Sequence, residues 1–233
     1  MKTKLVCLTG LLCDRLVWQG VAEQLKPLAD VEIISFAGFD DLTAMAQSVL
    51  QQVEGKFALA GHSMGARVAL EVYRLAPERV THLALMNTGV HPKSEKEIPG
   101  RMRLIQLAQE RGTHVLASDW LRPMMSPQGL RNAPLMAKLE QMVSAYSVAQ
   151  FEGQIRALLN RPDAQSILPT IQVPTLLLSG SEDTWSPVAQ HQVMQDKIAN
   201  SELVVVEGVG HMAPVEAPDK VADAMTIWLA KGN

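Results

Sequence analysis

Gly61-His62-Ser63-Met64-Gly65 lies between a short apolar run, residues 57–60, and a stretch with helical character that continues to residue 75. A G-x-S-x-G segment between a strand and a helix presents the serine hydroxyl on a sharp, strained turn above a parallel sheet. Glycines flank the serine in such turns because a side chain there would collide with the neighbouring strand or helix. The segment therefore predicts a strand, a tight turn with Ser63 at its apex, and a helix.

An acid and a histidine occur in two later turns. Gly180-Ser181-Glu182-Asp183 and Gly208-Val209-Gly210-His211 each come directly after an apolar run that is typical of a strand. A serine hydroxyl is a weak nucleophile at neutral pH and needs a base within hydrogen-bonding reach. His211 is predicted to be that base, and Asp183 is predicted to hold its imidazole in the correct tautomer. The chain order serine, aspartate, histidine indicates a serine hydrolase.

Short apolar runs bounded by polar or turn residues recur along the chain, and they are rich in leucine, valine and isoleucine. Such runs are typical of strands that are covered on both faces. The predicted strands are residues 4–8, 31–36, 56–60, 82–86, 174–179 and 203–206, and the helical patterns between the early ones are residues 17–28, 42–53 and 65–75. Asp40 or Asp41 is predicted to cap the second of these helices. The alternation predicts a parallel sheet with helices on both sides.

One long segment breaks this alternation, because residues 91–170 contain no strand signal. Helical patterns instead cover residues 100–111 and start again near Asn132 and at Ser147. We interpret the segment as a helical cap inserted between two strands. The predicted domains are an α/β core of residues 1–90 and 171–233 and a cap of residues 91–170.

Composition limits the classes of function. The 233-residue chain is 47% hydrophobic and 19% charged, so it can bury a sizeable core, and its net charge of −3 gives no reason to expect nucleic acid or a membrane as a partner. Gly10 interrupts the first apolar run, which favours a buried strand over a signal peptide. Cys7 and Cys13 do not indicate a disulfide framework, so a cytoplasmic location is expected. The remaining histidines have no partners at ligand spacing, so no metal site is expected.

The three turns resemble those of the α/β-hydrolase superfamily, in its branch of small, capped serine hydrolases that use no cofactor. The resemblance covers nearly the whole chain and rests on residues 61–66, on residues 180–183 with Pro187, and on residues 208–211 with Glu216 and Pro218. It implies an α/β-hydrolase fold with about six mostly parallel strands. Three features depart from the family pattern: Thr9-Gly10 stands where His-Gly is common, only Gly38 remains of a glycine-rich turn, and the leading β-hairpin is expected to be missing.

This architecture also implies where the oxyanion of the tetrahedral intermediate is bound. One donor is the backbone N–H after the nucleophile, here that of Met64, and the other comes from the loop after the first strand, for which Leu11 is the candidate. The cap of such an enzyme forms the acyl pocket, which makes Trp120, Met124 and Trp185 the candidates for contact with substrate. His62 and Glu216 are predicted to support the site without acting in the reaction.

The expected activity is hydrolysis of a small-molecule carboxylic ester, or of a thioester, through an acyl-Ser63 intermediate. The apolar cap favours a small to medium, largely apolar acyl group. A second interpretation is a carbon–carbon bond hydrolase or lyase with the same triad, which a cap arginine pointing into the pocket (Arg101, Arg103 or Arg122) would favour. A third is a ligand receptor or pseudoenzyme on the same fold. The sequence leaves the substrate and the oligomeric state open.

Overall fold

A computed structural model describes residues 2–232, so residues 1 and 233, at the ends of the predicted core segments, lie outside the described part. Six parallel strands form one sheet in the order β2-β1-β3-β4-β5-β6. The strands are β1 (Thr3–Leu8), β2 (Ala29–Ile34), β3 (Phe57–His62), β4 (Val80–Met86), β5 (Thr175–Gly180) and β6 (Ser201–Val206). The predicted fold class, a six-stranded parallel sheet with no antiparallel edge among the described residues, is confirmed.

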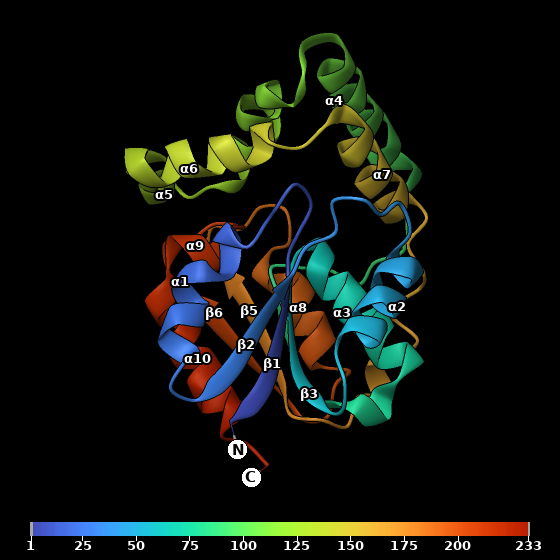
Figure 1. Cartoon of the computed structure of the whole chain (residues 1–233), viewed down its shortest axis with the longest axis vertical. Helices are drawn as coiled ribbons and strands as arrows, with labels where there is room; N and C mark the ends of the chain where they lie inside the picture. The colour runs from blue at the N-terminus through green and yellow to red at the C-terminus, as the bar shows by residue number, and fades with distance from the viewer. Residues whose placement is uncertain (1, 233) are drawn as a thin grey trace.

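Helices cover both faces of the sheet. α1 (Leu16–Leu25) packs against α10 (Pro218–Leu229) on one face, and α2 (Leu42–Gln52) packs against α3 (Met64–Leu75) on the other (Figure 1). α8 (Val188–Gln195) packs on β5 and β6. The central strands β3 and β5 are buried along their whole length, whereas the edge strands β2 and β6 are partly exposed. Continuous apolar sequence therefore marks the centre of the sheet, as expected for parallel strands covered by helices.

The boundary of the second strand differs from its prediction by two residues. β2 covers Ala29–Ile34 and not residues 31–36, and α1 accordingly ends at Leu25 and not at residue 28. Phe36 misled the prediction because its ring is fully buried beyond the end of the strand, where it packs edge-to-face on Phe39 with the ring centroids 6.1 Å apart. An apolar run in the sequence indicates buried residues. Burial continues beyond the last residue that is hydrogen-bonded into the sheet, so the run does not mark the end of the strand.

Between β4 and β5 the chain forms helices over the carboxyl ends of the strands (Figure 1). The longer ones are α4 (Ile98–Arg111), α6 (Ala133–Ser144) and α7 (Val148–Leu159), and the shorter ones are α5 (Pro127–Arg131), η2 (Glu95–Glu97), η3 (Thr113–Val115), η4 (Ala117–Leu121) and η5 (Arg122–Met124). Asn132 and Ser147 cap α6 and α7 through their side-chain oxygens, and Gly112 ends α4 with a φ of 84°. Asp41 caps α2 in the same way. The capping residues in the sequence therefore predicted the starts of α2, α6 and α7 and the end of α4 correctly.

Three short elements complete the chain: η1 (Pro77–Arg79), η6 (Leu168–Thr170) and α9 (Ala213–Glu216). Cys7 and Cys13 are both free and buried. Over residues 2–232, no helix combines the length and the apolar character that crossing a membrane requires.

Candidate active site

Ser63 lies on the strained turn that its sequence context predicts, between β3 and α3. Its backbone has φ 55° and ψ −117°, outside the regions that non-glycine residues favour. A Cβ on Gly61 would overlap the carbonyl oxygen of Gly65, and a Cβ on Gly65 would overlap that of Leu8 in β1. The two glycines are therefore required by close backbone contacts, which hold the serine at the carboxyl end of the sheet.

The structure brings Ser63, His211 and Asp183 together from three distant parts of the chain. His211 Nε2 lies 2.9 Å from Ser63 Oγ, and His211 Nδ1 lies 2.9 Å from Asp183 Oδ2. Asp183 follows β5, and His211 lies in the loop between β6 and α9. These two loops meet because Gly180 has no side chain; a Cβ there would overlap the carbonyl oxygen of Val209. The imidazole thus connects alcohol and carboxylate, so it is placed to remove the serine proton while remaining oriented by the acid.

Four hydrogen-bond donors surround the carboxylate of Asp183. Oδ1 accepts the backbone N–H groups of Trp185 and Ser186, each at 2.9 Å, and Oδ2 accepts His211 and, at 3.0 Å, Asn87 Nδ2. Burial opposes ionisation of this carboxyl group, but the hydrogen bond and charge of His211, with the bonds from Ser186 and Asn87, hold its pKa well below its usual range. Asp183 is therefore an anion at neutral pH.

Asn87 is a site residue that the sequence interpretation missed. It follows β4 directly, has a left-handed φ of 49°, and donates both to Asp183 and, at 3.3 Å, to the carbonyl oxygen of Gly210. Its amide therefore connects the acid loop to the histidine loop. The signal that could have found it is its position, because a polar residue at the carboxyl end of a central strand faces the site of an open parallel sheet.

His62, the neighbour of the nucleophile, supports the histidine loop. Its Nε2 lies 2.8 Å from the carbonyl oxygen of His211, and because a carbonyl only accepts, this nitrogen carries the proton. Burial, together with the nearby His211, lowers the pKa of His62 to about 3. The ring is consequently neutral at physiological pH and serves as a fixed hydrogen-bond donor.

The base of the cap also holds the histidine loop. The backbone N–H of His211 donates to the carbonyl oxygen of Met124 at 2.8 Å, and the carboxylate of Glu216 accepts the backbone N–H of Ser126 at 3.0 Å. Burial raises the pKa of Glu216 although Ser126 and other donors oppose that rise. Glu216 thus connects α9 to the start of α5, in the supporting role expected for it.

Leu11 and Met64, the two candidates for oxyanion donors, both line the cavity above Ser63. Met64 is the first residue of α3, and the first N–H groups of a helix have no partner within the helix. The helix dipole adds to the attraction of that N–H for a negative charge. Leu11 lies in the turn after β1. In this turn the carbonyl oxygen of Gly10 accepts a hydrogen bond from the backbone N–H of Cys13 at 3.3 Å.

A buried glutamine of the cap fixes this turn and was not anticipated. Gln154, on α7, accepts the backbone N–H of Leu12 at 2.9 Å and donates to the carbonyl oxygen of Phe36 at 3.0 Å. Its side chain is fully buried, and Leu12 has the strained φ of 55°. The amide therefore ties the loop that carries Leu11 to the segment that follows β2.

Replacing Gln154 by leucine is expected to lower kcat for an ester by about tenfold, with a smaller change in KM. The substitution leaves the N–H of Leu12 and the carbonyl of Phe36 without their partner, so the loop that carries one oxyanion donor loses its anchor. Steady-state kinetics with p-nitrophenyl butyrate will measure the effect, with the exposed Gln141→Leu change on α6 as the control. A folded Gln154→Leu protein with unchanged kcat would contradict the role.

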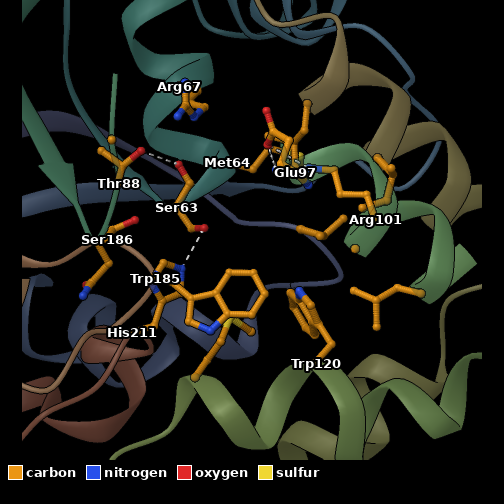
Figure 2. A pocket seen from close by; sticks show the side chains of 18 of the residues that line it. Ser63, Met64, Arg67, Thr88, Glu97, Arg101, Trp120, Trp185, Ser186 and His211 are labelled. Atoms are coloured by element: carbon orange, nitrogen blue, oxygen red, sulfur yellow. Dashed lines mark hydrogen bonds and ion pairs between the residues drawn. The ribbon is translucent and has the colours of Figure 1, made fainter. Parts of the chain in front are cut away.

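A cavity of about 480 Å³ lies between the cap and the sheet and opens onto Ser63. The three candidates for substrate contact all line it: Trp120 and Met124 are buried, whereas Trp185 is 45% exposed at the entrance. Figure 2 shows Trp120 and Trp185 on the side of His211, facing Ser63. Apolar side chains thus form one part of the wall.

Another part of the wall carries charged side chains, among them arginines, which the expectation of an apolar cap did not include. Of the three cap arginines considered, Arg101 lines the cavity, Arg103 lies at its edge with 65% of its side chain exposed, and Arg122 pairs with Glu140 outside the lining. Arg67, on α3, also lines the cavity and was not predicted. Its signal was helical spacing, because it follows Ser63 by four residues and so lies on the same face.

The alpha/beta hydrolase family matches the chain over residues 5–224. A pimeloyl-[acyl-carrier protein] methyl ester esterase of Legionella pneumophila is 26% identical over 213 residues, which cover 89% of this chain and 87% of that protein. A Klebsiella pneumoniae protein, provisionally named the carbamate hydrolase RutD, is 28% identical over 86% of this chain and 74% of its own. A malate-bound thermophilic esterase of Thermogutta terrifontis superposes with a TM-score of 0.89 at 27% identity, over 99% of this chain and 90% of that one.

Proposed function

We propose that this chain, which belongs to the alpha/beta hydrolase family, hydrolyses a carboxylic ester through an acyl-enzyme intermediate on Ser63. One observation carries the proposal: the Ser63 hydroxyl, the His211 imidazole and the Asp183 carboxylate are connected by two hydrogen bonds of 2.9 Å at the floor of a cavity. The esterase names of the proteins from Legionella pneumophila and Thermogutta terrifontis support the same reaction class.

In the first half of the reaction, His211 Nε2 takes the Ser63 proton as Oγ attacks the ester carbonyl carbon. The N–H groups of Met64 and Leu11 stabilise the oxyanion that forms. His211 then donates the proton to the departing alcohol, which leaves the acyl group bound to Ser63. In the second half, water attacks that acyl group with His211 again as the base, and His211 returns the proton to Ser63 Oγ as the bond to the carboxylic acid breaks.

The apolar part of the cavity wall supports an acyl group of small to medium size. Its lining includes Leu11, Leu104, Trp120, Met124, Ile155 and Leu158. A thioester presents the same carbonyl to the same groups, and so does a carbamate, the substrate class in the name of the Klebsiella pneumoniae relative. Contacts worth about 1–3 kcal/mol per methylene decide among chain lengths, so a substrate panel and not the fold will rank them.

A fluorophosphonate probe tests the proposal directly, because it reacts with a serine that a neighbouring base has activated. Labelling of the purified protein at a peptide that contains Ser63, together with turnover of p-nitrophenyl esters and thioesters of two to eight carbons, is the expected result. Absence of labelling, combined with tight binding of a small molecule, would contradict the proposal and favour the receptor interpretation.

A carbon–carbon bond hydrolase on the same triad is the second candidate, and the observation that favours it is Arg101 in the cavity wall. Substrates of that class carry carboxylates, which a guanidinium binds well. The two candidates differ in the bond that is cleaved. Turnover of a ring-cleavage dienoate at a kcat/KM above that of every ester in the panel would favour the second.

A further inference from the structure

Two arginines face the cavity from opposite elements near Ser63. Arg67 comes from α3 of the core, and Arg101 comes from α4 of the cap. Figure 2 shows Arg67, Glu97 and Arg101 on one side of Ser63, with Trp120 on the other side. The cavity therefore has a cationic end and an apolar end, and the serine hydroxyl lies between them.

The carboxylate nearest to these two arginines, that of Glu97, is fully engaged. Its Oε1 accepts Arg161 Nη2 at 2.7 Å and the backbone N–H of Ser94 at 2.9 Å. Its Oε2 accepts Arg101 Nε at 3.1 Å. Burial opposes ionisation of Glu97, but the hydrogen bond from Arg161 and the other donors lower its pKa to about 2, so it is an anion at neutral pH.

Arg161 has a structural role and is not available to a ligand. Its side chain is only 1% exposed, and beside Glu97 it donates to three carbonyl oxygens, those of His91 at 3.2 Å, Leu158 at 2.8 Å and Pro92 at 2.8 Å. These bonds join the start of the cap to the end of α7. Of the three guanidinium groups near Glu97, that of Arg161 is therefore fully engaged in hydrogen bonds within the protein.

Arg67 has no such partner. Its hydrogen bond goes to the carbonyl oxygen of His91 at 3.4 Å, and among residues 2–232 no carboxylate lies within ion-pair distance of its guanidinium. Burial, with the neighbouring charges of Arg161 and Arg101, lowers the pKa of Arg67 to about 9, and Glu97 offsets only part of that effect. A half-buried guanidinium with one long hydrogen bond and two cationic neighbours is costly for the fold.

We propose that Arg67, assisted by Arg101, binds a carboxylate of the substrate, so that the natural substrate is an ester which carries a negative charge. This inference rests on the proposed function, because it deepens the substrate class of the same site. A guanidinium can hold a carboxylate through two parallel hydrogen bonds, which adds both affinity and orientation. The carboxylate would occupy the place that no side chain of the protein fills.

The spacing along α3 favours a short distance between the charge and the scissile bond. Arg67 follows Ser63 by four residues, which corresponds to a rise of about 6 Å along a helix. A half-ester of a short dicarboxylic acid would reach from the Ser63 hydroxyl to the guanidinium. An ester of a hydroxy acid would present the same group from the alcohol side.

The test compares matched pairs of esters that differ only in the charge. Mono-p-nitrophenyl glutarate against p-nitrophenyl pentanoate places the carboxylate on the acyl side, and 3-carboxyphenyl butyrate against phenyl butyrate places it on the alcohol side. We expect the wild type to prefer the charged member of one pair by about ten- to a hundred-fold in kcat/KM. Arg67→Met is expected to abolish the preference, and Arg67→Lys to retain part of it. Arg156→Met is the control, because it removes the same charge elsewhere on the protein. Arg156 is exposed, and its Nε lies 3.6 Å from Asp40 Oδ2.

The outcomes separate the inference from the proposed function. Hydrolysis of the neutral esters without preference in either pair would overturn the anionic substrate and leave the esterase standing. If no ester is hydrolysed, the proposed function fails, and binding still tests the inference: glutarate should raise the Tm of Ser63→Ala protein but not that of the Ser63→Ala/Arg67→Met protein. Equal shifts in both proteins would overturn it. The Tm of Arg67→Met without ligand should be no lower than that of the wild type, because the arginine has no ion pair to lose.

Discussion

Ser63→Ala is expected to lower kcat for p-nitrophenyl butyrate by about a million-fold, to the residual rate that the oxyanion donors and substrate binding supply. The hydroxyl is the group that attacks, so without it no acyl-enzyme forms although the His211 base, 2.9 Å from Ser63 Oγ in the wild type, remains in place. Alanine keeps the Cβ, so the strained turn with φ 55° and its two close glycine contacts remain as they are. The loss should therefore appear in kcat with little change in Tm.

The measurement needs protein free of contaminating esterase, because a million-fold loss is easily masked. Active-site labelling by a fluorophosphonate, which should disappear in Ser63→Ala, gives a second readout that does not depend on turnover. Ser48→Ala on α2, whose hydroxyl bonds only to the carbonyl of Met45, is a matched control and should keep full activity. Undiminished cleavage by purified Ser63→Ala protein would remove the basis of the proposed mechanism.

Local sequence was sufficient to predict the turn and the helix starts, because close backbone contacts and caps restrict residue type directly. Gly61 and Gly65 have no room for a Cβ, and Asn132 and Ser147 place a side-chain oxygen on the first turn of a helix. These constraints act within a few residues or between adjacent strands. They leave a signal that one sequence can reveal.

Side chains that act through tertiary contacts left no such signal. Gln154 is one of several glutamines on cap helices, and only its burial against Leu12 and Phe36 distinguishes it. The spacing of Arg67 from Ser63 could have placed it near the site, but its lack of an ion pair was hidden, because that depends on how Glu97 is shared between two arginines more distant in sequence. The cap was expected to favour a largely apolar acyl group, with a cap arginine in the pocket as the alternative, and the directions of its side chains could not be inferred from helical spacing.

The acid of the triad carries the second large prediction. Asp183→Asn is expected to lower kcat by about ten-thousand-fold, because the four donors around this position dictate how an amide would be placed. The N–H groups of Trp185 and Ser186 would hold the asparagine oxygen where Oδ1 now lies. Its NH₂ group would then face His211 Nδ1, which must become an acceptor and move its proton to Nε2. A protonated Nε2 facing Ser63 cannot take the serine proton, so the base is lost although the residues stay in place.

Asp183→Asn is also expected to change how Tm depends on pH, which distinguishes this buried acid from a surface carboxylate. A carboxyl group whose pKa is lowered in the folded state stabilises the fold above its unfolded pKa, about 3.9, and that contribution disappears as the pH falls through the folded value. The Tm difference between wild type and Asp183→Asn should therefore be largest near neutral pH and shrink below about pH 4. Glu182→Gln changes the adjacent, exposed acid and should leave kcat unaltered. If Glu182→Gln lost activity while Asp183→Asn kept it, the hydrogen bond of 2.9 Å between Asp183 and His211 would not be the one that orients the base.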